Sequence, residues 1–77
     1  MKEEKRRSEA AKEILRERLQ ECRKKKGISA SVVSELCGLS HEQIARYESG
    51  EQEPKASALA AIADFYEVSV DWLLGNK

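Results

Sequence analysis

The chain has 77 residues, of which 36% are charged and 40% hydrophobic, with only 4 Gly and 1 Pro. This length suits one small domain without a separate catalytic domain, and the composition excludes wholesale disorder and a turn-rich β fold. No apolar run approaches the roughly 20 residues of a membrane span, and none follows the basic amino terminus as in a signal peptide. We therefore expect a cytoplasmic protein without membrane association.

The formal net charge of zero conceals a division along the chain. Residues 1–26 carry 11 of the 14 Lys and Arg residues and a net charge of +5, whereas residues 27–77 carry a net charge of −5. This division is typical of an arm that meets a polyanion, and also of a solvated helix. We assign residues 1–12 to a charged arm or helix extension and residues 13–77 to the folded domain.

The first predicted helix spans residues 8–26, with Ser8 at its start, although the charged residues before it could also be helical. It carries one apolar stripe at helical spacing, and Gly27 ends it. Two short helices follow at 30–37 and 41–48, separated by Gly38. Ser29 caps the first of them, and Ser40 with Gln43 forms a capping box on the second. The side chains expected to point inward from these three helices are Ala11, Leu15, Leu19, Cys22, Val32, Val33, Leu36, Ile44 and Tyr47.

A polar loop containing the only proline leads to a fourth helix at 56–66 and to a short fifth helix at 70–74, capped by Ser69 and ended by Gly75. The fourth helix has its apolar residues at helical spacing, and no segment alternates as a strand does. The sequence therefore predicts an all-α fold, a compact five-helix bundle. Its remaining core residues are Leu59, Ile62, Ala63, Tyr66 and Val68.

Catalytic and metal sites are poorly supported. Cys22 and Cys37 match no zinc pattern, and His41 is the only histidine. There is no Gly-rich phosphate loop and no paired catalytic constellation. We expect no enzyme activity, no metal and no cofactor.

Residues 29–48 form two capped helices joined by a tight glycine turn, which is helix-turn-helix geometry. Around them, residues 15–74 resemble the lambda repressor-like helix-turn-helix domain, the type of Cro and the phage repressors. The matching segments are Arg18-Leu19, Arg23 before Gly27-Ile28-Ser29, Gly38-Leu39-Ser40, Ile44 with Tyr47-Glu48-Ser49-Gly50, Pro54, Leu59 with Ile62-Ala63, and Val68-Ser69-Val70-Asp71-Trp72-Leu73-Leu74.

The resemblance implies sequence-specific binding of double-stranded DNA by a transcriptional regulator, in particular a phage- or mobile-element-type repressor. It also implies a homodimer on a palindromic operator, with the third helix in the major groove. The implied base contacts are His41, Glu42, Gln43 and Arg46. The implied phosphate contacts are Ser29, Ser31, Ser40, Ser49 and Lys55, joined by Arg6 and Arg7 if the amino terminus acts as an arm.

The family also implies a semi-buried ion pair between Arg23 and Glu48 that orients the third helix. A dimer contact through Val70, Trp72 and Leu74 is suggested by the excess of apolar residues in the short last helix, and Ile14 could join it. The alternative is that these residues only cover the core.

Two features depart from the family. Ala30 stands where a phosphate-holding Gln is usual, and the loop after the third helix is acidic (Glu51-Gln52-Glu53) where it is often basic. Both weaken phosphate attraction. They leave open a second function, a protein-interaction module that partners or antagonises a related regulator. An antitoxin or a restriction-modification controller would share the DNA-binding pattern.

Overall fold

The computed structural model of the chain describes residues 2–76, with side chains from Ser8 onward. This part contains five helices and no strand: α1 (Lys2–Lys26), α2 (Ala30–Leu36), α3 (Gln43–Ser49), α4 (Ala56–Tyr66) and α5 (Val70–Leu73). The predicted all-α fold is confirmed. The helical backbone of α1 continues back to Lys2, so Ser8 does not begin the helix.

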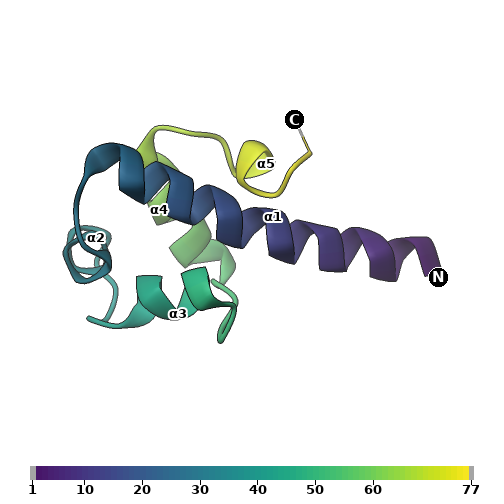
Figure 1. Cartoon of the computed structure of the whole chain (residues 1–77), viewed down its shortest axis with the longest axis horizontal. Coiled ribbons are helices and arrows are strands. Elements are labelled where there is room, and N and C mark those ends of the chain that lie inside the picture. Colours follow the sequence, from purple (N-terminus) through teal and green to yellow (C-terminus); the bar gives the residue numbers. More distant parts are fainter. Residues whose placement is uncertain (1, 77) are drawn as a thin grey trace.

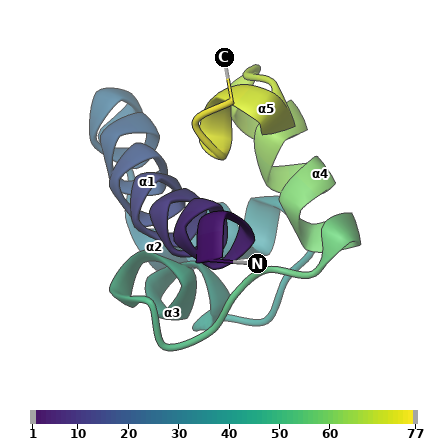
Figure 2. The same ribbon diagram turned by 90° about the vertical axis from the view of Figure 1, so that its right-hand side faces the viewer.

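The long helix α1 is the axis of the molecule, and its amino-terminal end projects beyond the other helices (Figure 1). It packs against α3 and α5, while α2 packs against α3 and α4 against α5. Viewed along α1, the pair α2 and α3 lies below it and the pair α4 and α5 beside it (Figure 2). The described part measures 38 × 23 × 20 Å.

The core lies where these helices meet. Its buried hydrophobic residues are Leu15, Leu19, Cys22, Val33, Ile44, Tyr47, Ala58, Ile62, Ala63, Tyr66 and Leu73. The inward side of α3, read from Ile44 and Tyr47, is confirmed. The expectation for α2 is wrong at two positions, because Val32 is 40% and Leu36 62% exposed. This seven-residue helix packs instead through the side that carries Val33 and Ser34, both fully buried.

Two of the predicted caps are present and one is not. Ser29 Oγ accepts a hydrogen bond from the Val32 amide at 3.3 Å, and Ser69 Oγ accepts one from the Trp72 amide at 2.9 Å. The capping box is wrong, because residues 41 and 42 form a turn and α3 begins only at Gln43. Ser40 therefore lies before the helix, and its carbonyl accepts from the Gln43 amide at 3.0 Å.

Candidate nucleic-acid interface

The turn between α2 and α3 sets the angle at which α3 is presented. Gly38 has a φ of 73°, a left-handed conformation that residues with a Cβ rarely adopt. The next residue, Leu39, packs against the core, and its amide donates to the Ser34 carbonyl at 2.8 Å. The hydroxyl of Ser34 then accepts from the Ile44 amide at 3.0 Å. One buried serine of α2 thus fixes the start of α3.

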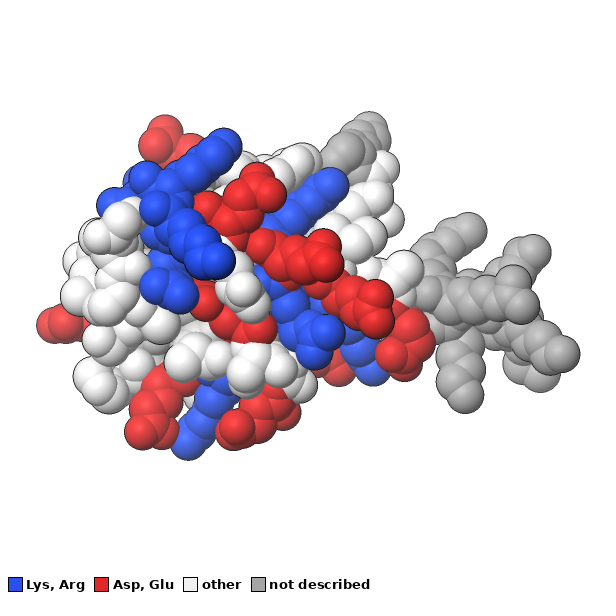
Figure 3. Space-filling view, in the orientation of Figure 1, with Lys and Arg blue, Asp and Glu red and all other residues white. Residues whose placement is uncertain are grey.

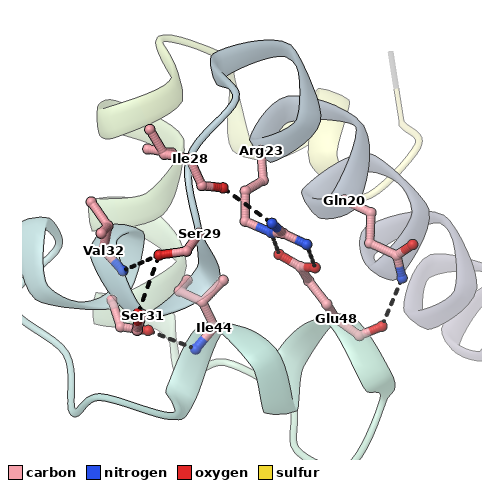
Figure 4. A network of polar contacts seen from close by, with 9 residues as sticks. Gln20, Arg23, Ile28, Ser29, Ser31, Val32, Ile44 and Glu48 are labelled. Atoms are coloured by element: carbon pink, nitrogen blue, oxygen red, sulfur yellow. Dashed lines mark hydrogen bonds and ion pairs between the residues drawn. The ribbon is translucent and has the colours of Figure 1, made fainter.

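The other end of α3 is fastened to α1 (Figure 4). Arg23 Nε and Nη2 donate to the two carboxylate oxygens of Glu48, at 2.7 and 3.0 Å. Arg23 Nη1 also donates to the Ile28 carbonyl at 3.1 Å, and Gln20 Nε2 donates to the Glu48 carbonyl at 3.0 Å. The hydrogen bonds with Glu48 raise the pKa of the Arg23 guanidinium, which keeps that guanidinium charged.

With its inner side held in this way, α3 turns its other side to solvent. Glu42 and Ala45 are exposed there, and His41 is exposed in the preceding turn. Arg46 Nη2 lies 2.7 Å from Glu42 Oε2, and Arg46 Nε lies 3.4 Å from Glu51 Oε2. Of the four residues predicted to contact bases, the structure therefore brings Glu42 and Arg46 into contact, and it leaves His41 exposed just before α3.

Gln43, the fourth predicted base contact, is half-buried, in contrast to the exposed His41 and Glu42. Its Nε2 donates to the Tyr47 hydroxyl at 3.0 Å, one turn along the same helix. It also lines a groove between the helix-turn-helix turn and the start of α4. Ser40 and Lys55, two of the predicted phosphate contacts, line the same groove.

The other predicted phosphate contacts do not gather in that groove. Ser29 and Ser31 lie at the start of α2, with their hydroxyls 3.2 Å apart. Ser49 Oγ donates to the Arg46 carbonyl at 3.1 Å and accepts from the Glu51 amide at 3.3 Å. Arg6 and Arg7 belong to the helical backbone of α1, but their side chains lie outside the described residues.

Charge is distributed unevenly over the surface. Basic side chains gather over the carboxyl-terminal end of α1, whereas acidic and basic side chains alternate over α3 (Figure 3). The last turn of α1 carries Arg23, Lys24, Lys25 and Lys26. In the acidic loop, Glu53 Oε2 lies 3.8 Å from Lys12 Nζ, so the two loop carboxylates contact different cations. The surface around Arg46 is consequently not a continuous basic patch.

The last helix covers the end of the core. Leu73 is fully buried, while Val70, Trp72 and Leu74 are half-buried and pack against the core. The Arg18 guanidinium lies 4.5 Å from the centre of the Trp72 ring and also donates to the Trp72 carbonyl. Ile14 lies against Gly75, where a side chain would collide with it. Much of the apolar surface that suggested a dimer contact is therefore used within the chain.

Neither a metal site nor a membrane span is found in the described part of the chain. No group of three or more His, Cys, Asp or Glu side chains there could hold a metal ion. No described helix is both long and apolar enough to cross a membrane. Cys22 and Cys37 are free thiols, and burial raises the pKa of both.

The fold and the outward face of α3 define a helix-turn-helix protein. The helix-turn-helix family model matches residues 19–73, and the chain belongs to this family, as the sequence resemblance predicted. The HTH-type transcriptional regulator AnsR of Bacillus subtilis (strain 168) is 41% identical over 61 residues, 79% of this chain and 53% of AnsR. The SPbeta prophage-derived HTH-type transcriptional regulator YonR of the same strain is 34% identical over 58 residues, 75% of this chain and 54% of YonR.

A solved structure shows the same arrangement of helices. The crystal structure of the P22 c2 repressor in complex with synthetic operator 9T matches with a TM-score of 0.76 and 30% identity. The match covers 82% of this chain and 96% of that one. By contrast, the chain spans about half the length of the curated relatives it matches.

Proposed function

We propose that this chain is the sequence-specific DNA-binding unit of a transcriptional regulator of phage-repressor type, acting in the cytoplasm. The observation that carries the proposal is the mounting of α3. Its inner side is fixed by Ser34 and Arg23, and its outer side presents Glu42 and Arg46. A rigid helix with an exposed, hydrogen-bonding face is what major-groove readout requires. The match to a repressor in complex with its operator supports the same use of this face.

Arg46 is the residue best suited to read a base. Its planar fork of donors matches the O6 and N7 acceptors of guanine, the commonest specific contact in the major groove. Glu42 contacts it, and His41 is exposed in the turn that precedes α3. The groove that holds Ser40, Gln43 and Lys55 supplies phosphate contacts on one side of α3.

Binding to DNA is tested by selection from a random duplex library at low salt, followed by salt titration of the selected duplex. The Arg46→Ala variant should lose roughly 1–3 kcal/mol of discrimination at one base pair per half-site. Lys25→Ala is the matched control, because it removes one exposed positive charge from the last turn of α1, outside the helix-turn-helix. It should leave base preference unchanged.

Failure to bind DNA would favour the alternative function, a protein-interaction module that partners or antagonises a related regulator. If no duplex is enriched by the wild-type chain and Arg46→Ala changes nothing, the helix-turn-helix serves as a scaffold for protein contact. The observation on the side of this alternative is that Arg46 lies between the carboxylates of Glu42 and Glu51.

We further propose a homodimer on a palindromic operator, with Val70, Trp72 and Leu74 contributing to the contact. Support comes from the half-buried state of all three side chains, which leaves part of their apolar surface exposed. Sedimentation over a range of concentrations should show a dimer that Val70→Lys weakens. A wild-type chain that remains monomeric at high concentration would overturn the contact.

A further inference from the structure

The segment after α3 is folded back onto Arg46. Gly50 has a φ of 83°, which ends α3 in a left-handed turn. The Arg46 carbonyl then accepts hydrogen bonds from Ser49 Oγ at 3.1 Å and from the Gln52 amide at 3.3 Å. The Arg16 side chain of α1 lies directly against Gly50. The loop is thus held on both sides, and it delivers the Glu51 carboxylate to the guanidinium of Arg46.

Glu42 and Glu51 take different nitrogen atoms of that guanidinium. Glu42 pairs with Nη2 at 2.7 Å and Glu51 approaches Nε at 3.4 Å. Among the described residues, the guanidinium of Arg46 donates one hydrogen bond, from Nη2 to Glu42. Because a guanidinium is planar, partners on Nε and Nη2 fix its orientation. Each Nη atom carries two hydrogens, so Nη1 and the second hydrogen of Nη2 remain to donate two hydrogen bonds to a base.

From this geometry we propose that Glu51 is a positioning residue for base recognition, which together with Glu42 holds Arg46 in the orientation that reads guanine. The inference rests on the proposed function. The ion pairs of Arg46 with Glu42 and Glu51 are not expected to stabilise the fold, because pairs between side chains as exposed as these contribute very little. The gain lies in a guanidinium that is already oriented when it meets the base, so that less side-chain freedom is lost on binding.

The loop offers a matched control for this role. Glu53 has the same charge and the same 66% side-chain exposure as Glu51, but its carboxylate lies near Lys12 and not near Arg46. Loss of either charge weakens repulsion of the DNA backbone, and Glu53 also lines the groove of Ser40 and Lys55. Only Glu51 is placed to change which base is preferred.

The test compares the wild type with three glutamate variants, in selection from a random duplex library and in titration of single-base variants of the selected duplex. Arg46→Ala, alone and combined with Glu51→Ala, completes the set. Glu51→Ala should reduce discrimination at the guanine position by roughly three- to tenfold, out of the roughly 5- to 150-fold that a bidentate pair provides. Glu51→Gln removes the charge but keeps an acceptor, so it should retain most of the discrimination. Glu53→Ala should retain all of it, while all three variants bind an unselected duplex somewhat more tightly than the wild type.

Three outcomes decide the question. Equal base preferences for Glu51→Ala and Glu53→Ala would overturn the inference and reduce Glu51 to a general repulsive charge. A loss that Glu51→Ala still causes when added to Arg46→Ala would also overturn it, because Glu51 would then act on another group. If the wild-type chain enriches no duplex, the proposed function itself falls, and that failure is recognised without any variant. Circular dichroism checks that the variants fold, which the exposure of Glu51 favours.

Discussion

The hydroxyl of Ser34 in α2 caps α3 from a distance, accepting a hydrogen bond from the Ile44 amide at 3.0 Å. The residue that precedes α3, Glu42, makes no side-chain cap. Since the first amides of a helix have no partner within it, a buried amide here would otherwise be unsatisfied. The two helices of the helix-turn-helix are therefore joined by a hydrogen bond as well as by the turn.

Replacing Ser34 by Ala should accordingly destabilise the domain by about 1–2 kcal/mol, the usual cost of a lost cap with a buried donor. Ser57→Ala is a suitable control, because Ser57 is exposed in the first turn of α4 and Ala favours helix formation there. Urea unfolding measures both variants. Equal, small effects would show that water satisfies the Ile44 amide once Ser34 is gone.

Glu67 ends α4 in the left-handed conformation, with a φ of 57°. Among the described residues it is the only non-glycine with a positive φ. Such a conformation costs a residue with a Cβ roughly 1–2 kcal/mol, and glycine nothing comparable. Glu67→Gly should raise the free energy of unfolding by about 0.5–1 kcal/mol, because the flexibility of glycine in the unfolded chain offsets part of the gain.

A glycine introduced into the body of α4 should instead lower the free energy of unfolding. Ala60 is exposed in the middle of that helix, and Ala60→Gly should cost about 1 kcal/mol. Thermal unfolding of the two variants side by side separates the effect of the local conformation from that of glycine in general. A loss of stability in both would contradict the argument.

The two buried tyrosines differ in their hydroxyl groups. The Tyr47 hydroxyl accepts from Gln43 at 3.0 Å, whereas the Tyr66 hydroxyl has no hydrogen-bond partner among the described residues. Tyr66→Phe should therefore stabilise the domain by about 0.5–1 kcal/mol, while Tyr47→Phe should destabilise it by a similar amount.

Alkaline pH should increase the difference in free energy of unfolding between the Tyr66→Phe variant and the wild type. Burial raises the pKa of the Tyr66 phenol well above its ordinary value. The folded chain thus keeps a proton that the unfolded chain loses above about pH 10, so wild-type stability falls as pH rises past that value. The Phe variant lacks this loss. Urea unfolding at about pH 7 and about pH 10.5 checks the difference, and a constant gap would contradict the assignment.

The sequence predicts the helices well because its signals are local. Glycines mark the turns, Ser29 and Ser69 cap the helices that follow them, and Ile44 with Tyr47 identifies the inner side of α3. Only the family resemblance predicts the pairing of Arg23 with Glu48, because the two residues lie on different helices.

What the sequence did not predict depends on contacts across turns. Ser34 lies in a short helix of mixed polarity, and nothing in the sequence indicates that its hydroxyl accepts from the Ile44 amide ten residues later. The approach of Glu51 to Arg46 depends on the left-handed turn at Gly50, which helical periodicity does not describe. Helical spacing predicts Val32 and Leu36 to point inward, but they are exposed, because so short a helix does not define one apolar side.

The Arg23–Glu48 pair offers a test of whether an ion pair serves orientation or stability. The Glu48 side chain is only 9% exposed and that of Arg23 24% exposed, so removing one partner leaves a poorly solvated charge. Glu48→Leu alone should cost about 2–4 kcal/mol, somewhat less than for a fully buried pair. Replacing both residues, by Arg23→Met with Glu48→Leu, should restore most of that loss, because a well-packed apolar pair often matches a buried ion pair.

DNA recognition should not recover in the same way. The bidentate bonds fix the rotation of α3 relative to α1, and apolar side chains pack without that directional constraint. We expect the free energy of unfolding of the double variant to lie within about 1 kcal/mol of that of the wild type. Its preference between bases in library selection should nevertheless be weaker. Full recovery of both stability and preference would mean that packing alone orients α3. Recovery of neither would mean that the hydrogen bonds of Arg23 to Glu48 and Ile28 stabilise the fold directly.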